Sequence, residues 1–217
     1  MDRTKFLRLT EKYGDCSSWA IWNPKDEADP TIIESHIEAL NAKHVFVALN
    51  AWGDFVRNLP WANFRGGKHD RKLKYACNDT ALRGSYLTDL FKRIEEVKAG
   101  KVQENLTLED IKKHVSLFVE EMSEIGTTKE TIYIILGVNC REMFKKHFLE
   151  KLGDVKVIPY YHYSYTLPDE RWVMGIWEKL GITANYETIR QKYKNAVRVN
   201  NKKSSTRLVL SDFKKSG

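Results

Sequence analysis

One stretch constrains the fold of this chain more than any other, because an apolar run in it stops abruptly at a polar loop. Residues Val45–Leu49 are all apolar, and Asn50, Ala51, Trp52 and Gly53 follow them. A short apolar run bounded by turn-forming residues predicts a strand inside a sheet. Its carboxyl end would present the Asn50 amide to a loop, which is where open α/β sheets bind their ligands. An asparagine in this place is also a common turn former.

Further strands and helices alternate along the rest of the chain. This alternation predicts an α/β fold, a three-layer sandwich in which helices flank a central, mostly parallel sheet of roughly four strands. A single domain over residues 1–217 is expected, with a loop-rich cover at 1–28 and a basic arm or tail at 191–217. Additional strands are predicted at residues 83–91, 131–136 and 155–159, and helices begin at Asp29-Pro30, after Thr107, at Gly137 and near Thr166.

Composition narrows the classes of function. The formal net charge of +7 fits a polyanionic partner such as DNA. Residues 191–217 contain eight Lys and Arg residues and a single acidic residue, Asp212. Such an excess of positive charge is typical of either a solvated tail or a phosphate-contacting arm. We expect a cytoplasmic monomer that contacts no membrane, since no apolar run reaches about 18 residues and the start lacks a signal peptide. Three cysteines without a CxxC pair predict neither disulfides nor a metal site.

Two of these strand ends also carry a family resemblance. The segments Ala48–Gly53 and His162-Tyr163-Ser164 resemble, in order and spacing, the first and last motifs of the uracil-DNA glycosylase superfamily. Those motifs read Gly-Gln-Asp-Pro or Gly-Ile-Asn-Pro-Gly, and His-Pro-Ser or Asn-Pro-Ser. The chain is closest in style to the mismatch-specific Gly-Ile-Asn-Pro-Gly branch, although both prolines are missing. The resemblance covers roughly residues 43–180 and implies the glycosylase fold.

The resemblance implies a monofunctional DNA glycosylase. Such an enzyme flips a uracil or a modified cytosine-type base and hydrolyses its N-glycosidic bond, which leaves an abasic site. Asn50 would orient the attacking water, and His162 would donate a hydrogen bond to the base as negative charge develops there. Ser164 would bind a DNA phosphate. The reaction needs no metal and no other cofactor, and Asp54 or Asp70 could assist the water.

Base recognition would fall to a second group of side chains. Phe64 begins a Phe-Arg-Gly-Gly segment that resembles the family's Phe-x-Gly pocket, so Phe64 is the first candidate for stacking and Trp61 the second; either ring could instead be packing. His69 is a further candidate for the pocket. Asp89 stands where uracil-selective members carry Asn, and an ionised carboxylate only accepts hydrogen bonds. It would oppose uracil O4 but suit the amino group of a cytosine-type base. Alternatively, Asp89 caps a following helix.

Other functions remain open at this stage. Excision could serve DNA repair or defence against phages with modified DNA. A catalytically idle nucleic-acid-binding relative is the alternative, because an amide is a poor base for activating water. An unrelated nucleotide-binding protein is disfavoured, since the chain has neither a G-x-G-x-x-G nor a Walker loop.

Overall fold

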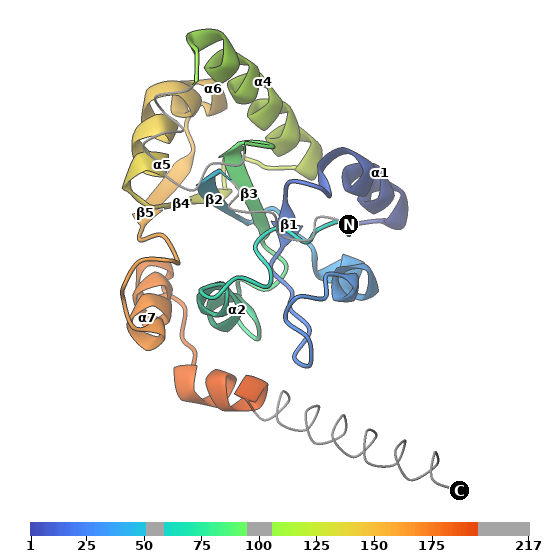
Figure 1. The fold of residues 1–217 in the computed structure, drawn as a ribbon, viewed down its shortest axis with the longest axis vertical. Coiled ribbons are helices and arrows are strands. Elements are labelled where there is room, and N and C mark those ends of the chain that lie inside the picture. The colour runs from blue at the N-terminus through green and yellow to red at the C-terminus, as the bar shows by residue number, and fades with distance from the viewer. Residues whose placement is uncertain (51–58, 95–105, 195–217) are drawn as a thin grey trace, which may run out of the picture.

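A five-stranded mixed sheet forms the centre of the protein, in a computed structural model that describes residues 1–50, 59–94 and 106–194 (Figure 1). The strands are β1 (Ser18–Trp19), β2 (His44–Asn50), β3 (Tyr86–Phe91), β4 (Ile132–Leu136) and β5 (Lys156–Tyr160), in the order β1-β3-β2-β4-β5. Strands β3, β2, β4 and β5 are parallel, and β1 pairs antiparallel with β3. The predicted α/β fold with a mostly parallel sheet is confirmed.

Helices cover both faces of the sheet. Those on one face are α1 (Arg3–Tyr13), α4 (Leu108–Ile125), α5 (Val138–Met143) and the turn η2 (Phe144–Phe148), which α6 (Leu149–Leu152) continues. The other face carries α2 (Arg71–Cys77) and α7 (Asp169–Leu180). A 3-10 helix, η1 (Thr31–Ala39), leads into β2, and another helix begins at Tyr186. None of the helices within the described ranges is long and apolar enough to cross a membrane.

The apolar run of β2 is buried on both faces, as its sequence predicts. Val45 and Val47 join the core under α1 and α4, whereas Phe46 and Ala48 join the core under α2 and α7. All four side chains are at most 1% exposed. A strand buried on both faces needs apolar residues at every position, which is why this run shows no polar alternation.

Local signals fix the ends of the longer helices. Thr107 caps α4 with a reciprocal capping box to Asp110, which confirms the predicted start of that helix. Gly181 ends α7 in the left-handed conformation, also as predicted. The helix expected from Asp29-Pro30 is instead the 3-10 helix η1, because non-helical angles at His36 break it into two pieces.

The N-terminal stretch differs from its prediction. Residues 1–28 were expected to be rich in loops, but α1 occupies most of the first half and β1 follows it. The Asp2 side chain caps α1 by accepting from the backbone N–H of Lys5. Phe6 and Leu9 then recur at helical spacing and pack into the core. The expectation of a loop is therefore wrong for this part of the chain.

Candidate functional site

Parallel strands bring several of the predicted residues to one edge of the sheet. Asn50 is the last residue of β2, and Asp89 of β3 pairs in register with Ala48. Residues two apart in a strand point to the same face, so Asn50 and Asp89 share the face covered by α2 and α7. His162 follows β5 at the same edge. This edge is the carboxyl end of the parallel strands, as the sequence predicts.

Asn50 is held in place by a hydrogen bond. Its Nδ2 donates to the carbonyl oxygen of Ile94 at 3.2 Å, and the side chain is only partly buried. An amide fixed in this way keeps a constant direction at the strand end. Asp54, the other candidate from this motif, lies outside the described residues.

His162 packs against the end of β4, where glycine is required. Gly137 has a φ of +94°, and a Cβ at this position would lie 3.3 Å from the His162 Cβ. The Gly137 N–H donates to the Tyr160 carbonyl at 2.8 Å, which ties the two strand ends together. A side chain at position 137 would therefore strain the backbone and crowd the histidine.

The loop around His162 selects one tautomer of its imidazole. Nδ1 lies 3.2 Å from the backbone N–H of Ser164 and 2.7 Å from the Ser164 Oγ. Because the backbone N–H can only donate, Nδ1 is the acceptor and the proton sits on Nε2. Burial, together with the nearby His69 and Lys72, lowers the pKa of His162 to about 4. The ring is thus neutral at physiological pH and has an N–H to donate.

Phe64 and Tyr163 form an aromatic wall beside this histidine. The ring centroids of Phe64 and Tyr163 are 6.2 Å apart with planes at 61°, and Tyr163 lies 4.2 Å from the His162 ring. Burial and the charges of Asp70 and Asp89 raise the pKa of Tyr163 well above its ordinary value. Tyr163 replaces the motif's proline, and sequence reasoning did not assign its ring to the site. Its position one residue after His162 was the available signal.

Asp89 is an interior strand residue. It is 2% exposed, and its Oδ2 accepts from the Asn63 Nδ2 at 2.8 Å. The Oδ1 of Asn63 in turn accepts from the backbone N–H of Phe64 at 3.1 Å, so one amide connects the carboxylate to the aromatic wall. Since Asp89 lies within β3, the alternative that it caps a helix is wrong.

Trp61 lies in the core on the other face of the sheet. Its ring is 3% exposed and packs near Phe6, Trp19 and Tyr86, and its Nε1 donates to a threonine hydroxyl. Phe64, by contrast, belongs to the core under α2 and α7. The structure thus gives Trp61 a packing position and brings only Phe64 to the side of His162.

Arg65 anchors the loop that carries Phe64, a role that sequence reasoning missed. This arginine is 5% exposed, and its guanidinium donates to the carbonyl oxygens of Trp19, Ile21 and Trp61. Burial lowers its pKa to about 10. Phe64 itself has a φ of +62°, a backbone conformation that residues other than glycine adopt only where the surrounding contacts impose it.

Asp70 and His69 lie at the start of α2. The Asp70 Oδ2 accepts from the Gly67 N–H at 2.8 Å, and burial raises the pKa of this carboxyl. Burial and neighbouring lysines lower the pKa of His69. The charge of His69 acts on His162, and the charge of Asp70 acts on Tyr163. Raised carboxyl pKa values are common where a carboxyl takes part in proton transfer.

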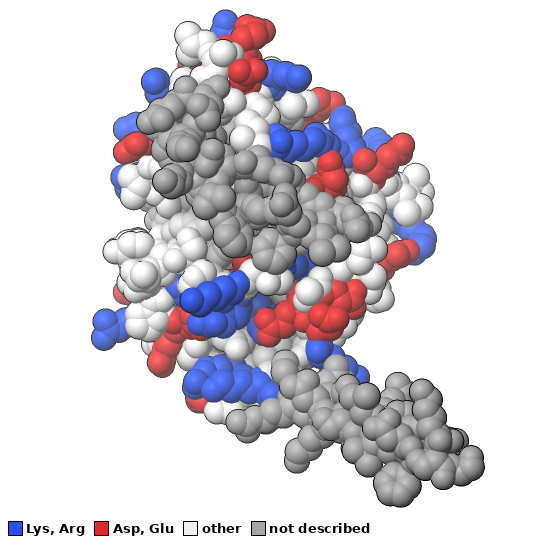
Figure 2. Space-filling view, in the orientation of Figure 1, with Lys and Arg blue, Asp and Glu red and all other residues white. Residues whose placement is uncertain are grey.

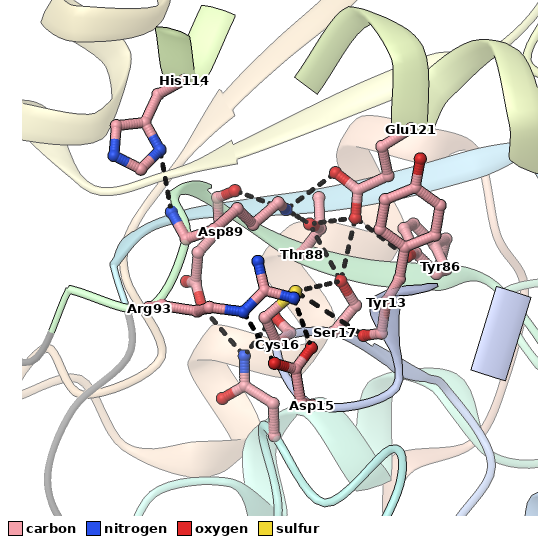
Figure 3. A network of polar contacts seen from close by, with 12 residues as sticks. Tyr13, Asp15, Cys16, Ser17, Tyr86, Thr88, Asp89, Arg93, His114 and Glu121 are labelled. Atoms are coloured by element: carbon pink, nitrogen blue, oxygen red, sulfur yellow. Dashed lines mark hydrogen bonds and ion pairs between the residues drawn. The ribbon is translucent and has the colours of Figure 1, made fainter. Parts of the chain in front are cut away.

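A buried polar network supports β3 from the opposite side (Figure 3). The Glu121 carboxylate of α4 accepts from Ser17, Tyr86 and Thr88, each at 2.9 Å, and lies 2.7 Å from the Lys92 ammonium. Lys92 also donates to the backbone carbonyl of Asp89 at 2.7 Å. The network therefore fixes the strand end that carries Asp89.

No metal centre is formed by the residues that the structure describes. Within those ranges, no group of three or more His, Cys, Asp or Glu side chains is placed to hold an ion. Cys16, Cys77 and Cys140 are all free and buried, and burial raises the pKa of each thiol.

Comparisons with known proteins add no family assignment. No protein-family model matches this chain, and no curated protein is significantly similar to it in sequence. Any functional inference therefore rests on the motifs and on the geometry of the strand edge.

Proposed function

We propose that this protein is a DNA glycosylase that hydrolyses the N-glycosidic bond of a flipped uracil or modified cytosine-type base. The main support for this proposal is that His162 is neutral and carries its proton on Nε2, where it can donate a hydrogen bond. His162 lies at the same edge of the sheet as Asn50 and Asp89. The products are the free base and an abasic site. Repair of DNA and defence against phages with modified DNA are both compatible with this reaction.

The proposed reaction assigns one task to each group. The base departs with the electron pair of the broken C1′–N bond, and water supplies the hydroxyl that forms the new C1′–O bond and the proton that the base takes up. His162 would stabilise the departing base by hydrogen bonding, which a neutral imidazole can do. Asn50 would orient the water, and Asp70 is the described carboxyl that could accept its proton.

Asp89 supports a base with an exocyclic amino group. Its Oδ2 accepts from Asn63 at 2.8 Å, and an ionised carboxylate only accepts hydrogen bonds, which suits a base that donates through an amino group. Phe64, held beside it through the same amide, supplies an aromatic surface for the flipped base. Ser164 would have to share its hydroxyl between His162 and a DNA phosphate.

The test is base excision from a panel of DNAs that contain uracil, mismatches or modified cytosines, followed by alkaline strand cleavage. We expect Asn50→Ala and His162→Ala each to reduce the single-turnover rate by ~10²-fold or more, the scale for losing one preorganised group. His147→Ala is the matched control, because this histidine lies in η2 and also has a pKa lowered by burial. Unchanged rates in both site variants would contradict the assignment.

The same panel tests the alternative of a catalytically idle relative. An idle protein would bind DNA and produce no abasic sites from any member of the panel. Excision that survives in His147→Ala but not in His162→Ala would instead exclude it.

A further inference from the structure

Tyr161 and Tyr165 flank His162 in the sequence, and their side chains are half exposed to solvent. Tyr161 and Tyr165 are 51% and 50% exposed, and their rings stack with centroids 5.0 Å apart and planes at 13°. Aromatic side chains contribute most when they bury their large surfaces, so a stacked pair left half-exposed offers a face to a planar ligand. The proposed reaction does not use either ring.

The backbone under this pair is fixed by three hydrogen bonds. The Trp172 Nε1 donates to the Tyr161 carbonyl at 3.0 Å, and the Tyr165 N–H donates to the His162 carbonyl at 2.9 Å. The Lys72 ammonium donates to the Tyr165 carbonyl at 2.7 Å. The two rings therefore sit on an anchored loop, which limits the conformational entropy lost when a ligand stacks on them.

An open pocket of about 420 Å³ adjoins Tyr165, between α2, α7 and the helix that begins at Tyr186. Its size is within the range that holds a small organic ligand such as one nucleotide. Lys and Arg side chains gather in this part of the surface (Figure 2). Those that line the pocket are Arg71, Lys72 and Arg190. Arg71 is paired with Asp169, and Arg190 with Glu187.

Lys72 differs from the other two cations because no carboxylate of the described residues is in ion-pair contact with its ammonium, although the charge of Asp169 acts on it. It is 2% exposed, and its only hydrogen-bond acceptor there is the Tyr165 carbonyl, although an ammonium has three hydrogens to donate. Burial lowers the pKa of this amine. An anionic group in the pocket would give this ammonium a close, charge-assisted partner.

We propose that this pocket and the Tyr161–Tyr165 pair bind one unpaired nucleotide of a DNA single strand, next to the nucleotide that is flipped into the site of His162. Lys72 holds the phosphate, and the base stacks on the exposed tyrosine pair. Proteins that bind single strands without sequence preference combine aromatic stacking of the bases with positive side chains that follow the phosphate backbone. The choice of DNA rests on the proposed function, whereas the stacking surface and the anion site do not.

The experiment measures binding of a fluorescent twelve-residue oligothymidylate, which contains only normal bases, by anisotropy. Tyr161→Ala and Tyr165→Ala should each raise Kd by roughly 5- to 100-fold, the effect of losing one stacked base. Met174→Ala, at a side chain that is 51% exposed on α7, is the control and should leave Kd unchanged.

The phosphate contact has its own readout. Lys72→Met keeps the apolar stem and should reduce the slope of log Kd against log salt by about 0.7, the value for one phosphate contact on a single strand. Arg190→Gln provides a second, exposed variant at the pocket in case Lys72→Met fails to fold, and it should weaken binding in the same direction. Lys145→Gln, an exposed change in η2, should leave the slope as it is.

Three results would overturn this inference: wild-type affinity in both tyrosine variants, an unchanged salt slope in the pocket variants, or tighter binding of an oligouridylate RNA than of the DNA. Its failure is distinguishable from failure of the proposed function. Tyrosine-dependent binding without excision from any DNA would reject only the glycosylase. Excision accompanied by tyrosine-independent binding would reject only the nucleotide site.

Discussion

His162 is the residue whose surroundings say most about its chemistry. The backbone N–H of Ser164 points at Nδ1, and the Ser164 hydroxyl donates to the same atom. In a protonated ring Nδ1 would carry a hydrogen and could no longer accept these hydrogen bonds. Their loss would lower the pKa of His162 in the same direction as burial and the nearby positive charges. The loop thus keeps the histidine as a neutral hydrogen-bond donor.

The lowered pKa of His162 predicts a pH dependence of stability. The folded chain binds this proton near pH 4, whereas the unfolded chain binds it near the ordinary value of 6.5. The free energy of unfolding should therefore fall as the pH drops from about 6.5 towards 4. His162→Gln removes this contribution, so the variant should lose less stability than the wild type between pH 7 and pH 5.

Urea unfolding of both proteins at the two pH values is the measurement. His44 and His114, whose pKa values burial also lowers, remain in the variant and should maintain part of the slope. An identical loss of stability in the two proteins would show that His162 is not shielded as described.

Asp89 leads to a prediction about substrate choice. Asp89→Asn keeps the size of the side chain, and its amide oxygen can still accept from Asn63. The new NH₂ group offers a donor to uracil O4 in place of an opposed acceptor, a change of about 1–3 kcal/mol. We expect kcat/KM for uracil relative to a cytosine-type base to rise ~10-fold or more.

Asp70→Asn is the matched control, since this buried carboxyl also acts on Tyr163 but precedes α2 and does not belong to a strand of the sheet. Relative kcat/KM for the two base types should stay constant in the control. A constant ratio in Asp89→Asn as well would place base selection elsewhere.

At the scale of elements, strands were the most predictable part of the chain. The runs that form β2 and β4 are apolar at nearly every position, and few alternatives bury such segments. The capping box at Thr107 and the left-handed Gly181 depend on local chemistry, so the sequence alone contains them. Local signals were sufficient wherever the structure obeys local rules.

Elements that depend on distant contacts were missed. α2 buries Lys72 and Lys74, and no sequence pattern indicates that lysines will face inward. Lys74 can do so because it pairs with Glu27 of the N-terminal region. α1 was missed for another reason, since its three buried residues stand among many charges and form only a narrow stripe. Its Asp2 cap was nevertheless visible in the sequence.

Gly137, at the junction of β4 and α5, lies close to His162, and comparison with Gly153 separates the effect of this close approach from the effect of backbone strain. Gly137 and Gly153 both have positive φ values, +94° and +77°. An added methyl group at 137 meets His162, whereas at 153 it meets nothing within 4 Å. Gly137→Ala and Gly153→Ala should both lose about 1–2 kcal/mol of stability through strain.

Only Gly137→Ala should also reduce base excision, by ~10-fold or more, because displaced catalytic groups lose rate steeply. Single-turnover rates and urea unfolding on the two variants measure both effects. Equal rates in the two variants would mean that the position of His162 tolerates the shift.

At the scale of the whole molecule, the site depends on contacts that run through the sheet. Ser17 of the N-terminal segment, Thr88 of β3 and Glu121 of α4 meet in one buried network with Lys92. Arg65 ties the loop of Phe64 to the backbone around β1. Sequence reasoning could not supply these links, because each joins residues that are more than 25 positions apart.

The buried pair of Lys92 and Glu121 gives the prediction that tests this arrangement. Glu121 is fully buried and its Lys92 partner is 5% exposed, so removal of one charge leaves the other without compensation in a dry interior. Glu121→Gln should therefore lower the free energy of unfolding by about 3–5 kcal/mol. The exposed pair of Lys156 and Glu130, at 2.7 Å, is the control, and Glu130→Gln should change stability by less than about 1 kcal/mol.

A double variant separates the charge from the packing. Lys92→Met combined with Glu121→Leu removes both charges and retains apolar volume, so it should be more stable than Glu121→Leu alone. Urea unfolding of the wild type, Lys92→Met, Glu121→Leu and the double variant gives the coupling energy between the two side chains. If Glu121→Gln is no more destabilising than Glu130→Gln, the ion pair does not hold β3, and the end of that strand must be fixed by its apolar contacts with β2 and α4.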